Sequence, residues 1–62
     1  MNEEEQHRAD YEAQGKHREV IAAINRLLEE DGQRLSITDK MALTDVRDRC
    51  QAHSDAIVRR WS

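Results

Sequence analysis

The segment Asp31–Thr38 reads Asp-Gly-Gln-Arg-Leu-Ser-Ile-Thr, and it is the one place where one helical pattern stops and another begins. Gly32 is expected to end the first helix as a left-handed C′ residue. Ser36, which has Asp39 three residues later, and Thr38 are alternative N-caps for the second helix, and we favour Thr38. The segment therefore predicts a turn between two helices.

Helical periodicity continues on both sides of this turn. Apolar residues recur at spacings of three and four, proline is absent, and strong helix formers dominate the composition. We therefore predict an all-α hairpin with helices at about residues 3–30 and 39–60, within a single domain of residues 1–62. Gly15 weakens the first helix, so residues 1–15 are the part that we expect to fray.

The two apolar seams predict how the helices pair. In an antiparallel hairpin they match layer by layer when each pair of residue numbers adds to 70. The same register places the acidic stretch 1–15 beside the basic stretch 47–62. The predicted pairs are Leu27–Leu43, Ile24–Val46, Val20–Cys50, His17–His53, Ala13–Ile57 and Asp10–Arg60.

The apolar core of such a hairpin is small for 62 residues, and the single cysteine excludes an internal disulfide. A second apolar stripe lies outside the seam and stays uncovered in a lone hairpin. We therefore predict a homodimer that forms a four-helix bundle. The stripe consists of Ile21, Leu28, Met41, Val58 and Trp61.

The length, the single central turn and the heptad seam on each helix make the chain resemble the plasmid copy-number RNA-binding hairpin proteins. That resemblance implies a dimeric four-helix bundle. It covers the architecture alone, and no residue motif is shared. It therefore carries over no site and no function.

Three side chains near the middle of the seam are candidate metal ligands. Cys50 and His53 are three residues apart on one helix face, and the register places His17 opposite His53. A polar layer of hydrogen-bonded side chains explains the same residues with fewer assumptions, and a pH-sensitive layer is a third alternative. We predict no metal and no other cofactor.

Arginines on the second helix, Arg47, Arg59 and Arg60, are candidate nucleic-acid contacts. Aspartates are interleaved with them, and the net charge of −3 gives no general attraction to phosphate. A solvated helix surface with ion pairs is the favoured interpretation. An RNA- or DNA-binding regulator is the alternative function.

No pattern of nucleophile, base or paired carboxylates indicates an active site, so we predict that the chain is not an enzyme. The favoured function is that of a small adaptor, anti-activator or inhibitor, which occludes a larger host or cellular protein through a helical face. Small acidic proteins of this kind are typical of phages and other mobile elements. The candidate partner-binding residues are Tyr11, Ile21, Leu28, Val58 and Trp61.

The expected location is the cytoplasm. No apolar run is long enough to span a membrane, so no membrane association is predicted. The chain begins with an acidic segment that resembles no signal or transit peptide, and its single cysteine suits a reducing compartment.

Overall fold

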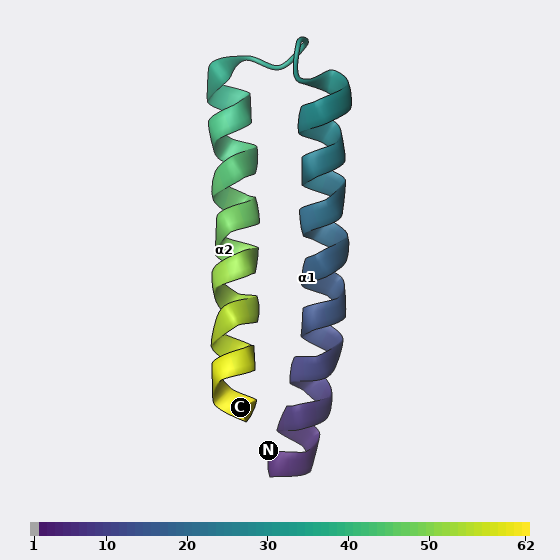
Figure 1. Ribbon diagram of the computed structural model, residues 1–62, viewed down its shortest axis with the longest axis vertical. Coiled ribbons are helices and arrows are strands. Elements are labelled where there is room, and N and C mark those ends of the chain that lie inside the picture. Colours follow the sequence, from purple (N-terminus) through teal and green to yellow (C-terminus); the bar gives the residue numbers. More distant parts are fainter. Residues whose placement is uncertain (1) are drawn as a thin grey trace.

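The computed structural model describes residues 2–62, which form two helices packed side by side (Figure 1). Helix α1 spans Glu3–Asp31 and helix α2 spans Ile37–Trp61. The connecting turn lies at one end and both termini lie at the other, so the helices run antiparallel. The predicted all-α hairpin is confirmed. Helix α1 continues through Gly15 without interruption, and the fraying of its first half stays a prediction.

Both helices begin at a side-chain cap. The Asn2 carboxamide oxygen accepts a hydrogen bond from the Glu5 backbone N–H at 2.8 Å. At the start of α2 the Ser36 hydroxyl accepts from the Asp39 N–H at 3.0 Å, and the Asp39 carboxylate accepts from the Ser36 N–H at 3.4 Å. The choice of Thr38 was therefore wrong. Ser36 is the N-cap because Asp39, at the third helical position, completes a reciprocal capping box with it.

The first helix ends without a left-handed residue. Gly32 has φ −56° and ψ −31°, which is right-handed, so the predicted conformation was wrong. The turn is closed instead by a bond from the Arg34 N–H to the Asp31 carbonyl, at 2.9 Å. Gly32 has a different steric role, because a Cβ at this position would clash with the carbonyl oxygen of Leu28.

Two polar layers confirm the predicted register. His17 and His53 lie within hydrogen-bond distance, with 2.7 Å between Nε2 of the first ring and Nδ1 of the second. Nearer the termini, Nη1 of Arg60 is 2.5 Å from Oδ2 of Asp10. These contacts are seven residues apart on each helix, so the hairpin keeps one register over this heptad.

The apolar core is confined to the centre of the seam. Among the described residues the buried hydrophobic side chains are Ile24 and Ile57, and Ile57 is only 2% exposed. Val20 and Val46 were predicted inside the seam, yet they are 39% and 47% exposed. Val20 and Val46 are exposed because each helix has only one neighbouring helix, which covers the middle of the apolar stripe and leaves its edge in water.

The molecule is a rod with extents of 46 × 18 × 15 Å. Such a thin body has no deep interior, so its binding capacity lies on its long surfaces and at its ends. Across the described residues, neither α1 nor α2 offers an apolar stretch of the length that a membrane crossing requires.

Candidate functional site

A buried carboxylate joins the helices at the open end of the hairpin. Asp10 of α1 accepts at Oδ2 from Nη1 of Arg60 and, at 2.7 Å, from the Trp61 indole N–H. Its Oδ1 accepts from the Gln6 carboxamide at 2.8 Å. No buried side-chain nitrogen or oxygen within residues 2–62 lacks a hydrogen-bond partner. This network therefore fastens the last turn of α2 to α1 without leaving an unpaired polar group.

The surroundings of Asp10 favour its charged form. The Trp61 indole N–H lowers the pKa of the Asp10 carboxyl most, and the Gln6 amide and the Arg60 guanidinium lower it further. Burial acts in the opposite direction, because desolvation disfavours the charge, but the hydrogen bonds dominate. Asp10 is therefore an anion at neutral pH and holds both donors from α2.

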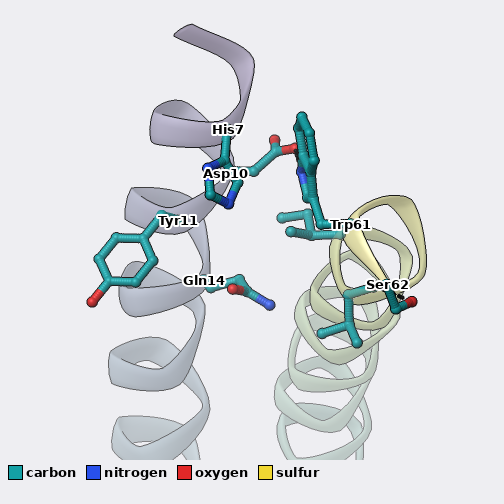
Figure 2. A pocket seen from close by; sticks show the side chains of 8 residues that line it. His7, Asp10, Tyr11, Gln14, Trp61 and Ser62 are labelled. Carbon is teal, nitrogen blue, oxygen red and sulfur yellow. Dashed lines mark hydrogen bonds between the residues drawn. The ribbon is translucent and has the colours of Figure 1, made fainter. Parts of the chain in front are cut away.

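Trp61 packs between the two helices at this end (Figure 2). Its ring contacts that of His7, with centroids 4.7 Å apart and planes tilted by 54°. Beside it lies an open pocket of about 270 Å³, to which Tyr11 and Val58 also contribute. The Tyr11 ring points away from α2 in Figure 2, so its outer surface faces solvent. Trp61 is thus positioned by the hairpin itself.

The most exposed large apolar side chains lie along one side of the rod. Ile37 and Val58 are separated by three heptads, so they lie on one side of α2, and Met41 follows Ile37 by one turn. Tyr11 lines the same pocket as Val58. Each of the four is more than half exposed, with Tyr11 and Ile37 at 76%. We call Tyr11, Ile37, Met41 and Val58 the apolar rim.

The predicted partner-binding set is only partly brought together. Tyr11, Val58 and Trp61 meet at the open end, whereas Leu28 lines a separate hollow of about 390 Å³ with Arg47. Ile21 is half-buried between these two places along α1. Ile37 was not among the predicted residues, because the second helix was expected to start at Asp39, which assigns Ile37 to the turn. The Ser36–Asp39 capping box was the signal that reveals it.

The three candidate nucleic-acid contacts do not share a surface. Arg47 donates to the Asn25 carboxamide oxygen at 2.9 Å, and Arg60 is bound to Asp10. At 3.6 residues per turn, Arg47 and Arg60 point about 140° apart around α2, and Arg59 points in a third direction. The arrangement gives no continuous basic face for phosphates.

The candidate metal ligands form a pair rather than a cluster. His17 and His53 meet edge to face, with their ring planes at 81°. Within residues 2–62 no three His, Cys, Asp or Glu side chains are placed to hold a metal ion. Cys50 is a half-buried free thiol. The two imidazoles instead form a hydrogen-bonded layer, in which one ring donates and the other accepts.

The fold and its surfaces define a small α-helical hairpin. The chain matches no protein-family model, and no characterised protein and no solved structure shows significant similarity to it. Its function is therefore argued from its own side chains.

Proposed function

We propose that the hairpin is a non-enzymatic regulator that binds a larger protein and occludes a groove on it. The observation that carries this proposal is the apolar rim, which leaves Tyr11, Ile37, Met41 and Val58 in water on one side of the rod. Exposed apolar side chains that lie together mark interaction surfaces, and here Ile37 lies beside Met41 at one end of the rod and Tyr11 beside Val58 at the other. Ile37 and Val58 are about 30 Å apart along α2, which suits a long groove.

The open end supplies the best anchor of this surface. Trp61 is already ordered by Asp10 and His7, so little side-chain entropy is lost when a partner covers it. Tyr11 adds an aromatic ring with a polar hydroxyl, which suits a site that is apolar inside and wet at its edge. Ile21 and Leu28 extend the contact along α1. Free Cys50 fits a cytoplasmic setting for this function.

The proposal includes a homodimer that forms a four-helix bundle. Its support is the small core, because among the described residues only Ile24 and Ile57 are buried hydrophobic side chains. The half-exposed Val20 and Val46 are ready to complete a larger core. A dimer makes the regulator bivalent, with one apolar rim on each copy.

Partner capture with matched variants tests the proposal. The tagged chain is incubated with an extract of its native cells, and bound proteins are quantified by mass spectrometry. We expect one protein to bind the wild type and to fall at least about tenfold with Tyr11→Ala/Val58→Ser. The control variant Glu19→Ala changes an exposed side chain away from the rim and should bind as the wild type does. Equal recovery with all three proteins would overturn the proposal.

The salt dependence of the captured complex separates the two candidate functions. An apolar protein interface should change little with salt, whereas a complex held by phosphate contacts weakens steeply. A dimeric RNA- or DNA-binding regulator that uses Arg47, Arg59 and Arg60 has less support, because two of these arginines are bound within the hairpin. A steep salt dependence together with nuclease-sensitive capture would favour it.

A further inference from the structure

We infer that a second copy of the chain packs on the flank of the seam that carries Val20 and Val46, and that this contact encloses the His17–His53 pair. The apolar rim lies on the other flank and stays free. The inference rests on the proposed dimer. It assigns the dimer to a surface other than the apolar stripe from which the sequence predicted it, and it adds how pH acts on the dimer.

The positions of residues around each helix place them on one or the other side of the buried seam, and we call these two sides its flanks. On one flank His7 contacts Trp61 and Asn25 contacts Arg47, so these residues close the gap between the helices. Val20 and Val46 each lie on the opposite side of the buried seam centre, three or four residues from Ile24 and Cys50. In the same column as Val46, His53 bonds to His17 and Arg60 bonds to Asp10. Val20 and Val46 nevertheless stay 39% and 47% exposed, so the hairpin covers this flank only in part.

The open flank is built from small and apolar side chains. At heptad spacing from Val20 and Val46 lie Ala13, Leu27 and His53, and the next positions outward are mostly alanine. Small residues allow two helix pairs to approach closely. We call this surface the alanine face, and it consists of Ala9, Ala13, Val20, Ala23, Leu27, Ala42, Leu43, Val46, His53 and Ala56.

The size and chemistry of the alanine face fit a second copy. A long side of the rod measures 46 by 18 Å, so it offers roughly 800 Å² to a partner. A standard stable interface buries about that area on each side. A surface of small apolar groups is complementary to itself, which a two-fold dimer requires. The charged residues at its edge are Lys16, Glu30 and Arg49. Both signs are present and Arg49 is paired with Asp45, so they do not repel a second copy.

The histidine pair lies about halfway along the rod. A two-fold axis through the face therefore brings the His17–His53 pairs of both copies close together. The charged and titratable groups around them are Lys16 on α1 and Arg49 and Cys50 on α2, and Arg49 is paired with Asp45 at 3.2 Å. When both imidazoles are protonated, neither can accept the hydrogen bond and four cationic rings are enclosed. The dimer should therefore weaken in acid.

Sedimentation equilibrium tests the location of the interface. We expect Val46→Glu to raise the dimer dissociation constant by at least about 30-fold, because it encloses an unpaired charge. The matched variant Val58→Glu carries the same change on the apolar rim and should stay as dimeric as the wild type. If Val46→Glu dimerises normally, or if Val58→Glu dissociates instead, the inference is overturned. Circular dichroism checks that both variants keep their helices.

A second measurement avoids substitution. Methyl NMR spectra of the wild type on dilution should shift the signals of Val20, Val46 and Ala13, and leave those of Ile37 and Met41 in place. The reverse pattern would overturn the inference. Lowering the pH from about 7.5 to about 5.5 should weaken the dimer about tenfold, and His53→Gln, which leaves only the two His17 rings, should reduce that dependence. A wild type that stays monomeric throughout overturns the dimer and leaves partner capture as a separate test.

Discussion

The two flanks of the same helical seam differ in how they are closed. On one flank polar side chains reach across, with Trp61 donating to Asp10 and Arg47 donating to Asn25. On the other flank Val46 and its neighbours remain half-exposed. A hairpin of two helices can cover the centre of its seam, but it needs long polar side chains to bridge an edge. On the other edge the polar contacts are those of His53 and Arg60, and the valines between and beside them stay partly in water.

The difference has a functional meaning because each flank offers a different surface. The closed flank orders Trp61 and presents the apolar rim beside it. The open flank is continuous with the buried seam, so a molecule that covers it extends the core. Stability measurements on matched pairs of positions test whether the two flanks differ in this way.

The largest effect should follow from the centre of the seam, which both flanks share. Ile57 is 2% exposed, so Ile57→Ala should cost about 2–4 kcal/mol of unfolding free energy through lost burial and a cavity. Urea unfolding followed by circular dichroism measures this loss. The neighbouring control Val58→Ala, on an exposed side chain, should cost less than about 0.5 kcal/mol. Similar losses at both positions would mean that Ile57 is not the core.

Substitutions at two adjacent residues of α1 allow the stability contributions of the two flanks to be compared directly. Ile21 is half-buried on the closed flank, whereas Val20 is on the open one. In dilute protein, Ile21→Ala should cost about 1–2 kcal/mol and Val20→Ala less than about 1 kcal/mol. In concentrated protein the cost of Val20→Ala should rise, because the second copy covers it. A cost that is independent of concentration at both positions would remove the distinction between the flanks.

The hydrogen bond that closes the open end should have a smaller effect. Trp61→Phe removes the indole donor to Asp10 and keeps an aromatic ring, and we expect a loss of about 1 kcal/mol in thermal unfolding. Tyr11→Phe is the control, because it removes an outward-facing hydroxyl and should change nothing measurable. An unchanged melting temperature for Trp61→Phe would show that Arg60 and Gln6 suffice to hold Asp10.

The smallest effect concerns how the charge of Asp10 makes stability depend on pH in acid. The pKa of Asp10 is lowered in the folded chain, so its contribution is complete above the ordinary carboxyl range and is lost as the pH falls through the lowered pKa. As the pH falls below about 4, the wild type should therefore lose more stability than Asp10→Asn. If the unfolding free energies of the two proteins fell by the same amount in acid, this prediction would be contradicted.

Much of the fold could be predicted because it depends on local patterns. Apolar spacing around His17 and His53 is set along each helix, and the charges of Asp10 and Arg60 agree with it, so one register satisfies both. The cap of α2 was missed because Ser36 and Thr38 are similar residues. The choice between them depends on whether Asp39 completes a reciprocal pair.

The candidate surface was less predictable for a different physical reason. Tyr11, Val58 and Trp61 were identified as apolar residues outside the seam, but the sequence does not reveal that Trp61 binds Asp10 across fifty residues of chain. Ile37 was assigned to the turn. Exposure depends on both helices together, and a pattern within one helix cannot report it.

By itself, the sequence determined that this protein is an antiparallel two-helix hairpin with one register, because helical periodicity and charge are properties of neighbouring residues. Only the tertiary structure decided which flank of the seam is closed. The sequence places Val20 inside the seam and Ile21 outside it, yet Val20 is 39% exposed and Ile21 is half-buried, because of what α2 places beside each of them. That difference leaves one flank to the apolar rim and the other to the alanine face.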